Sequence, residues 1–545
     1  MLSEPAVGKT FFGREEVLRV LEKRVHALKG GYRQNVALTG QMLSGKSSIL
    51  YQFLYTLKDS SLIPIYIEVM KEPFSVFVDK FIATLLFSYF ASSGHPKEKN
   101  LDDLTEFAEE AIPHTAYAIK KVKQDISRKN YHAAYKKLLD LTSVLKKETG
   151  KSCVVILDEF HNLEFFKIRK PYLHFGKIMM IQKDTMYIVS SSQKSAIKKI
   201  LSEKLALLFG NFEIVEVSGF DDKTAEAFLK EKFQGIETHA AYMDYLIDFT
   251  DGNPFYLDVI SKKIIEILNS GKSIAFEEPV IVEALASLLY KTSGTINQYF
   301  TNTILNLLEK SLREDCLEVL MALASGCNKL SDIAKWLNRK SKSGIADKLS
   351  ELIGSDMVYK SGVFYEVQDK VFSFWMRAVY HKKKTSLVND ILSKADEFKK
   401  EALANIRGYF AESRKTVFDR IKELFGLFNG ETVEIGKRNR KLPKFAKIEI
   451  RKYGKSDDLV AYQAPDKYWV SEICEHKIDE LAVADFIERH RALAHKKIYI
   501  ALGGIDENAL LLAKEKNIWV WGLENINGIL RLYKKHNLIQ KENTL

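Results

Sequence analysis

The sequence of 545 residues has few cysteines and lacks long apolar runs, and each of these absences excludes a class of protein. The four cysteines show no C-x-x-C spacing, so we expect neither a disulfide framework nor a zinc site, and we expect reduced thiols. No apolar run approaches the ~18 to 20 residues that a helix needs to span a bilayer. The opening residues also lack the apolar core of a signal peptide, so we expect a cytoplasmic protein.

Length and charge set the next bounds. A chain of this length exceeds what one hydrophobic core supports, and typical domain sizes suggest about three or four domains. The net charge of +11 and a pI near 9.0 favour polyanionic partners. The many lysines and glutamates are also typical of the surface of a thermophile's protein, so charge alone leaves both interpretations open.

A phosphate-binding motif follows an apolar strand expected at residues 35–38. The motif has the form G-x-x-x-x-G-K-[ST] and stands between that strand and the start of a helix, which is the context it requires. Its glycines let backbone N–H groups point inward, and the helix dipole adds positive potential, so the loop suits a polyphosphate. Lys46 would reach the β and γ phosphates of ATP, and Ser47 would ligate Mg²⁺. The predicted nucleotide-binding residues are Gly40, Gln41, Met42, Leu43, Ser44, Gly45, Lys46, Ser47 and Ser48.

Upstream of this motif, Phe12, Gly13 and Arg14 precede a helix expected at residues 15–28. In many P-loop ATPases of the AAA+ and STAND type, a similar F-x-G-R-E segment lies against the adenine. The same residues also fit a capped amphipathic helix with no contact to nucleotide.

Four further apolar runs, at residues 63–69, 152–159, 186–193 and 212–217, predict strands of the same sheet. The run at 152–159 ends in Asp158 and Glu159, as a buried Walker B strand requires. Asp158 would hold Mg²⁺ through water, and Glu159 would polarise the attacking water. The run at 186–193 predicts the strand between the P-loop and Walker B strands of the ASCE class. Ser191 or Ser192 would then be a sensor of the γ phosphate, although a serine-rich turn without function is the alternative.

A glycine and a proline punctuate two predicted helices at residues 250–257, TDGNPFYL. With the P-loop, the ILDEF strand end and the serine-ended strand, this segment resembles the archaeal ATPase family of the AAA+/STAND lineage, over nearly the whole chain. The resemblance implies a nucleotide-dependent switch in which the G-N-P segment, including Pro254, couples a helical lid to the nucleotide. One departure is Gly210-Asn211, where that family often has Gly-Arg before the fifth strand. Without that arginine we expect slow hydrolysis.

Beyond residue 312 the pattern changes to three short helices and a hairpin, expected at residues 313–324, 330–337, 341–353 and 358–365. This order is that of a winged helix, whose third helix can enter a DNA major groove. Donors to phosphates and bases would be Lys340, Ser341, Lys342, Ser343 and Lys348. A winged helix can also dock a protein or act as a spacer.

The last region resembles the restriction-endonuclease-like fold, in which clustered carboxylates bind Mg²⁺ that activates water. Expected strands lie at residues 446–451, 458–462, 468–474, 496–502 and 518–522. Glu412, Asp458 and Glu472 are the candidate carboxylates, and we take Asp458 and Glu472 as the metal pair. Cys474 occupies the position at which the D…(E/D)-x-K motif has lysine. Two interpretations remain open: the site is degenerate, or a different register uses Glu475 and Lys477.

The predicted fold class is α/β, with an ASCE/AAA+ parallel sheet core, a helical lid, a winged helix and an α/β nuclease-like end. The predicted domains are residues 1–217 with a helical insertion at about 97–148, then 218–300, 301–385, a helical connector at 386–405, and 406–545. The favoured function is an ATP- and Mg²⁺-dependent switch ATPase that hydrolyses slowly and binds double-stranded DNA. The alternative is a signalling or assembly scaffold that works with a protein partner or as a homo-oligomer.

Overall fold

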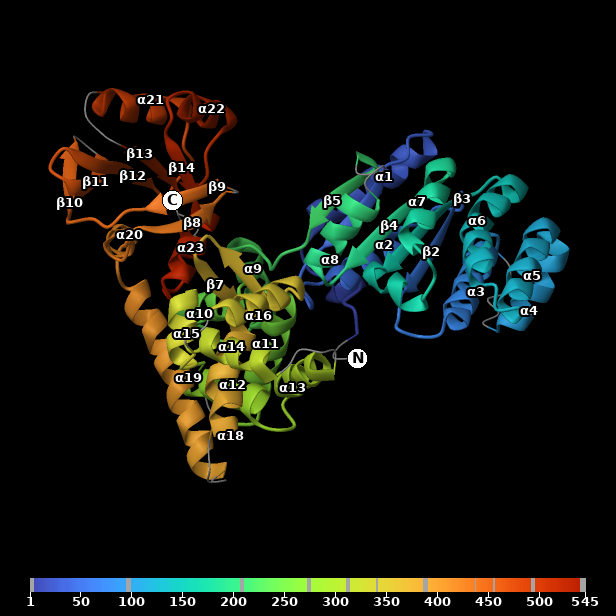
Figure 1. Cartoon of the computed structure of the whole chain (residues 1–545), viewed down its shortest axis with the longest axis horizontal. Helices are drawn as coiled ribbons and strands as arrows, with labels where there is room; N and C mark the ends of the chain where they lie inside the picture. Colours follow the sequence, from blue (N-terminus) through green and yellow to red (C-terminus); the bar gives the residue numbers. More distant parts are fainter. Residues whose placement is uncertain are drawn as a thin grey trace. The chain divides into compact units, whose positions relative to one another are not determined.

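The sequence folds around two five-stranded β-sheets, one in each half of the chain (Figure 1). The computed structural model describes residues 4–94, 100–205, 210–271, 276–309, 314–339, 342–385, 391–436, 438–453, 456–491 and 496–539. It divides into two compact units, Met1–Gly219 and Phe220–Leu545.

The sheet of the first unit has five strands in the order β2-β3-β4-β1-β5, and every pairing is parallel. The strands are β1 (Asn35–Thr39), β2 (Leu62–Glu68), β3 (Ser152–Asp158), β4 (Thr185–Ser191) and β5 (Phe212–Glu216). All five were predicted, and β4 lies between β1 and β3 as the ASCE class requires. The α/β class with a parallel P-loop core is therefore confirmed.

Both faces of this sheet are buried, which explains the uninterrupted apolar runs. Along β3, Val154 and Ile156 pack in one hydrophobic cluster with helix residues such as Leu21 and Phe53, while Val155 and Leu157 pack in another. Side chains alternate between the faces of a strand, so each apolar run supplies both clusters. The helices are α1 (Glu15–Lys29), α2 (Lys46–Thr56), α3 (Phe74–Ser92), α4 (Leu101–Ala111), α5 (Pro113–Ser127), α6 (Tyr131–Thr149), α7 (Pro171–Ile181) and α8 (Lys194–Lys199).

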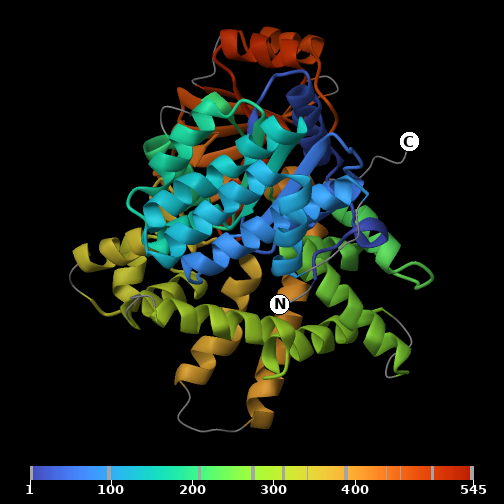
Figure 2. The same cartoon turned by 90° about the vertical axis from the view of Figure 1, so that its right-hand side faces the viewer.

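The predicted insertion forms α4, α5 and α6; α4 and α6 pack against α3, and α5 packs against both α4 and α6 (Figure 2). Helix α3 corrects one expectation from the sequence. Among the described residues, α3 is the one helix that is long and apolar enough, by length and composition alone, to cross a membrane. Its side chains Phe77, Phe81, Ile82 and Leu85 are buried in the core of the unit. Packing against β2 and the insertion therefore accounts for its apolar composition.

The second unit begins with helices where the lid was expected, followed by the predicted order of three helices and a hairpin. These elements are α9 (Asp222–Lys232), α10 (Ala240–Thr250), α11 (Pro254–Asn269), α12 (Glu278–Leu285), α13 (Thr295–Glu309), α14 (Glu314–Ala324), α15 (Leu330–Trp336), α16 (Ser343–Gly354), β6 (Val358–Ser361), β7 (Phe364–Val367), α17 (Lys370–Trp375), α18 (Lys382–Thr385) and α19 (Ile391–Ser413).

A mixed sheet in the order β10-β11-β12-β13-β14 closes the chain. Its first three strands are antiparallel, and its last three are parallel. The strands are β10 (Lys447–Tyr453), β11 (Ser456–Ala464), β12 (Lys467–Cys474), β13 (Lys496–Ala501) and β14 (Trp519–Gly522). The sequence predicted all five. It missed the hairpin of β8 (Glu431–Ile435) and β9 (Arg438–Leu442), and the helices α20 (Val417–Gly426), α21 (Glu480–Arg489) and α23 (Leu523–Leu532). Helix α22 (Glu507–Glu515) lies where a helix was expected.

Candidate functional site

The phosphate-binding loop joins the end of β1 to the start of α2, as predicted. Gly40 has no room for a side chain, because a Cβ there would lie 2.3 Å from the carbonyl oxygen of Val217. Leu43 and Gly45 have positive φ angles of 64° and 92°, which curl the loop before the helix begins. No side chain of the described residues caps α2 at Gly45. The N–H groups of its first turn are therefore suited to bind an anion.

Lys46 is buried, and its ammonium group donates to two carbonyl oxygens of the loop. Its Nζ lies 3.1 Å from the oxygen of Gly40 and 2.7 Å from that of Gln41. Burial lowers the pKa of Lys46, and the carboxylates of Glu159 and Asp158 oppose that shift. Lys46 therefore places a buried positive charge at the loop, and a bound polyphosphate needs a positive charge there.

Asp158, at the end of β3, is the centre of a hydroxyl network below the loop. Its carboxylate accepts a hydrogen bond from Ser47 Oγ at 2.8 Å and from Tyr66 Oη at 2.9 Å. Ser190 Oγ also donates to it. The two predicted Mg²⁺ ligands, Ser47 and Asp158, are thus brought into direct contact. Sequence reasoning missed Tyr66 and Ser190, which only the strand order places beside β3.

Glu159 follows in the left-handed conformation, with a φ of 52°. Its Oε2 accepts from the N–H of Ser192 at 3.1 Å and from Ser192 Oγ at 2.9 Å, and it lies 3.3 Å from His161 Nδ1. Burial, and then the charge of Asp158, raise the pKa of Glu159. The predicted sensor Ser191 contacts His161 Nδ1 at 2.9 Å. Its neighbours Ser190 and Ser192 are instead the serines that contact the carboxylates of Asp158 and Glu159.

The segment before α1 lies against the P-loop. The Arg14 guanidinium donates to the carbonyl oxygens of Ser44 at 3.2 Å, Ser218 at 2.6 Å and Gly219 at 3.3 Å. Gly13 and Arg14 both have positive φ angles, 64° and 70°. Arg14 therefore joins the P-loop to the last residues of the first unit.

Several predicted binding residues have structural surroundings that the sequence did not specify. Phe12 is half-buried, and Met42 is exposed. The Oγ of Ser48 accepts a hydrogen bond from the N–H of Ala6 at 3.1 Å. Direct contact of these side chains with a nucleotide stays a prediction.

The G-N-P segment is tightly packed within the second unit. Gly252 has a φ of 66°, and a Cβ there would lie 2.2 Å from the carbonyl oxygen of Phe220. The N–H of Phe220 donates to the Gly252 oxygen at 2.8 Å. Asn253 Oδ1 caps α11 by accepting from Phe255 N–H, and Pro254 is the first residue of that helix. The role of Pro254 at the nucleotide stays a prediction.

Charged residues that sequence reasoning missed hold this segment to the C-terminal end of the chain. Asp248 is buried and contacts Lys370 Nζ at 3.0 Å and His536 Nδ1 at 2.7 Å. Asp251 pairs with Arg531 at 3.1 Å. Burial opposes ionisation of Asp248, but Lys370 and His536 outweigh it and hold its pKa well below the ordinary value.

The carboxylates of the C-terminal sheet meet as predicted, but a guanidinium lies between them. Asp458 on β11 stands directly across from Glu472 on β12. Arg489, the last residue of α21, donates to Asp458 Oδ2 at 3.0 Å and to Glu472 Oε2 at 2.6 Å. His490 Nε2 lies 2.6 Å from the same Asp458 oxygen. Glu472 therefore faces Asp458, and the register that uses Glu475 and Lys477 is wrong.

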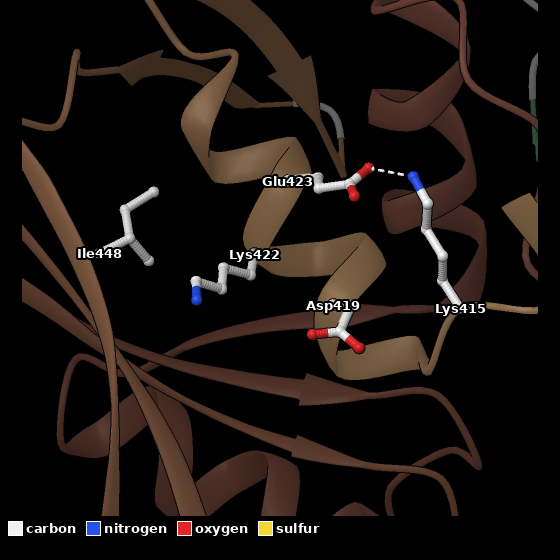
Figure 3. A pocket seen from close by; sticks show the side chains of 5 residues that line it. All are labelled: Lys415, Asp419, Lys422, Glu423 and Ile448. Carbon is white, nitrogen blue, oxygen red and sulfur yellow. Dashed lines mark hydrogen bonds and ion pairs between the residues drawn. The ribbon is translucent and has the colours of Figure 1, made fainter.

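Glu412, the third nuclease candidate, belongs to a different ion network. It accepts from Lys415 at 3.2 Å and from Lys535 at 3.0 Å. Lys415 also pairs with Glu423 at 2.7 Å, at one side of a pocket beside α20 (Figure 3). No group of three or more His, Cys, Asp or Glu side chains placed to hold a metal occurs in the part of the chain that the structure describes. The expectation that Glu412 joins Asp458 and Glu472 is thus not met.

In the region predicted to be a winged helix, Lys340 and Ser341 lie outside the described residues. Lys342 and Ser343, at the start of α16, are exposed, and Lys348 lies 3.5 Å from Glu351. The turn of the β6–β7 hairpin packs on β8, because a Cβ at Gly362 would lie 1.9 Å from the Thr432 oxygen. The N–H of Val363 donates to that same oxygen at 3.0 Å. The backbone of this turn is therefore engaged with protein.

The two sheet edges differ in how they suit a divalent cation. At the first edge, the Ser47 hydroxyl and Asp158 carboxylate are oxygen ligands of the kind Mg²⁺ prefers, and they adjoin an anion-binding loop. The buried hydroxyl of Ser44 also has no hydrogen-bond partner among the described residues, as expected of a group that awaits a ligand. At the second edge, Arg489 holds the position between the carboxylates, so Asp458 and Glu472 as arranged do not fit a metal.

Comparison with known proteins agrees with the P-loop assignment at the first sheet edge. Residues 11–260 match the family model described as an ATPase domain predominantly from Archaea. The match bears out the predicted resemblance over these residues, and the resemblance of the rest of the chain stays a prediction. No curated protein matches the sequence.

Solved structures with a similar fold come from archaea, among others. A Walker-type ATPase of Pyrococcus abyssi is 19% identical, with a TM-score of 0.47 over 69% of this chain and 99% of that chain. The ORC2 protein of Aeropyrum pernix, in ADPNP and ADP complexes, is 11% identical, with a TM-score of 0.44 over 75% and 98%. The ORC1 protein of the same organism, in complex with DNA, is 14% identical, with a TM-score of 0.39 over 74% and 96%.

The P-loop geometry, the strand order and the family match together define the class of this protein. It contains a P-loop ATPase domain built on a five-stranded parallel sheet.

Proposed function

We propose that this protein is an ATP- and Mg²⁺-dependent switch ATPase of the AAA+/STAND type that hydrolyses ATP slowly. The observation that carries the proposal is the contact of Ser47 with Asp158 at 2.8 Å, directly below the loop that holds Lys46. A nucleotide site needs these three groups in one place, and they come from two separate elements of the fold, the start of α2 and the end of β3.

Each residue has a distinct task in this proposal. Lys46 and the N–H groups at the start of α2 bind the phosphates. Mg²⁺, when bound, would neutralise phosphate charge, and Ser47 and Asp158 are the residues that would hold it. Glu159 orients the attacking water, for which its carboxylate must be ionised and freed from Ser192. Slow turnover is expected because Asn211 follows Gly210 where the related family has arginine.

Arg14 supports the switch part of the proposal. Its guanidinium bonds both to the P-loop at Ser44 and to the backbone of residues 218 and 219, which lead out of the unit. A shift of the loop on nucleotide binding would change these hydrogen bonds. The coupling therefore has a physical route within the first unit.

We propose double-stranded DNA as the partner of this protein. The domain limits predicted from the sequence are kept in this proposal. The net charge of +11 and the exposed Lys342 and Ser343 at the start of α16 support it. The competing proposal is a cytoplasmic assembly scaffold with a protein partner or further copies of the chain. The backbone engagement of the β6–β7 turn favours that alternative for the winged helix itself.

Calorimetric titration of ATP with Mg²⁺ tests the proposal. Lys46→Ala should weaken ATP binding by at least tenfold, about 1.4 kcal/mol, because it removes the charged phosphate contact of the motif. Lys120→Ala, at a surface ion pair with Glu109, is the matched control and should bind as the wild type does. Equal affinities of wild type and Lys46→Ala would refute nucleotide binding at this loop.

A further inference from the structure

We infer that Arg489 is a built-in replacement for the divalent cation at the carboxylate pair of the C-terminal sheet, so this domain does not cut phosphodiester bonds by a metal-dependent mechanism. The inference concerns the second unit alone and does not depend on ATP binding in the first.

The contacts of Arg489 place its charge between the two acids. One terminal nitrogen bonds Asp458 and the other bonds Glu472, which face each other across adjacent strands. The Nε bonds Asp485 one helical turn earlier, at 2.8 Å. Three carboxylates from three elements thus fix a single guanidinium, and its rigid fork leaves little freedom to move aside.

Burial makes this arrangement hard to reverse. Asp458 is fully buried, and the side chains of Glu472 and Arg489 are 14% and 15% exposed. Burial acts to lower the pKa of Arg489, but Glu472 and Asp458 raise it above the ordinary value. A metal ion entering the pair would have to displace a fixed charge from two desolvated partners.

His490 closes the site from another side. Its Nε2 contacts Asp458 Oδ2, the oxygen that Arg489 also binds. The other oxygen, Oδ1, is buried and has no hydrogen-bond partner among the described residues. Arg489 and His490 thus already contact Asp458 Oδ2, and Arg489 also bonds Glu472 Oε2, whereas Mg²⁺ demands octahedral coordination by oxygen ligands and waters. The sheet thus retains the two carboxylates with a guanidinium in the position between them.

Manganese binding to the full chain without nucleotide tests this inference by electron paramagnetic resonance. Arg489→Ala should gain one Mn²⁺ per chain, bound at least tenfold more tightly than any Mn²⁺ in the wild type. The double variant Arg489→Ala/Asp458→Asn should lose it, and Arg489→Lys, which keeps a cation, should not gain it. Wild-type Mn²⁺ binding that Asp458→Asn removes would overturn the inference, as would a folded Arg489→Ala that gains none.

A second measurement needs no variant and remains decisive if Arg489→Ala does not fold. Bound Fe²⁺ transfers one electron to added hydrogen peroxide, which splits into hydroxide and a hydroxyl radical, and the radical cuts the peptide chain near the metal. In the wild type we expect no scission near residues 458 and 472. Scission at both places would contradict the inference.

A different observation carries a second proposal, which rests on the proposed DNA binding. We propose that the face formed by β9 and Trp519 contacts the phosphate backbone of DNA. Arg440 lies 4.2 Å and Lys496 4.1 Å from the centre of the Trp519 ring. Arg438 is exposed on the same side of β9 as Arg440, two residues away.

These cations gather without acids. Burial, and then the charge of Arg440, lower the pKa of Lys496 to about 8, and burial and Arg438 lower that of Arg440. No carboxylate of the described residues forms an ion pair with any of the three. Like charges held together repel one another, and a polyanion removes that repulsion. Arginine stacked on a half-buried aromatic ring is suited to phosphate and nucleic acid.

The test is the salt dependence of binding to a short fluorescent DNA duplex. Arg438→Glu/Arg440→Glu should weaken binding at low salt by at least tenfold and reduce the slope of log affinity against log salt by about 2. Lys262→Glu/Lys263→Glu, which makes the same change of charge on α11, is the control and should keep the wild-type slope. Equal slopes in both variants would refute this surface while leaving DNA binding intact. If the wild type binds no DNA, the proposed partner fails with it.

Discussion

Two sheet edges of this protein carry a pair of acids, and they differ in the groups that contact those acids. At the end of β3, Asp158 is surrounded by the neutral hydroxyls of Ser47, Tyr66 and Ser190. At β11 and β12, Asp458 and Glu472 are bonded to the cation of Arg489. Among the described residues no ion pair involves Asp158, whereas Arg489 pairs with both Asp458 and Glu472. The second edge therefore already holds a protein cation between its acids, and the first edge does not.

The largest expected effect is on the rate of ATP hydrolysis at the first sheet edge. Glu159→Gln should lower ATP hydrolysis by about 10² to 10⁴-fold, because the amide cannot take a proton from water. ATP affinity should stay within about twofold, since Glu159 acts on water and not on the phosphates. Steady-state phosphate release measures the rate, with Glu164→Gln, an exposed acid paired to Lys204, as the control. An unchanged rate in Glu159→Gln would show that the Walker B assignment is wrong.

A smaller effect distinguishes the two edges by stability. Asp458→Ala removes the carboxylate that Arg489 and His490 share and should lower the free energy of unfolding by about 3 to 5 kcal/mol. Asp158→Ala leaves only hydroxyls without their acceptor and should cost about 1 to 3 kcal/mol. Urea denaturation of each variant gives both values. A cost at Asp158 equal to or above that at Asp458 would remove the distinction between the edges.

The smallest effect is on pH dependence. Because burial raises the pKa of Glu159, its ionised form disfavours folding, and this cost grows as pH rises through the raised pKa. The acid limb of ATP hydrolysis should therefore lie above the ordinary carboxyl value of 4.5. Ser192→Ala removes a hydrogen bond that lowers this pKa and should move the limb to higher pH. A limb that stays in place in Ser192→Ala would exclude Ser192 as a partner of the active carboxylate.

Much of the fold could be predicted because its signals are local. The strands of the first sheet are buried on both faces and read as continuous apolar runs, and the P-loop is specified by eight adjacent residues. Strand β12 of the C-terminal sheet also contains an apolar stretch with consecutive buried residues, whereas β10, with the sequence KIEIRKY, was recognised from alternating apolar residues. Hairpin β8–β9 was missed because β9 has the sequence RNRKL, which lacks apolar alternation.

The site partners that were missed come from distant parts of the chain. Tyr66 contacts Asp158 across 92 positions of sequence, and Arg489 reaches Asp458 across 31. No local pattern marks such contacts. A helix was expected at residues 75–89, within α3, but its apolar length was underestimated because Asp79 and Lys80 interrupt the run, although eight of its side chains are buried in the core.

The most direct test of the central claim counts Mn²⁺ on the full chain in the presence of ATP. We expect one Mn²⁺ per chain that is lost in Asp158→Asn and retained in Asp458→Asn. A bound Mn²⁺ that survives Asp158→Asn but disappears in Asp458→Asn would contradict it, because the C-terminal edge would then be the one that receives a metal.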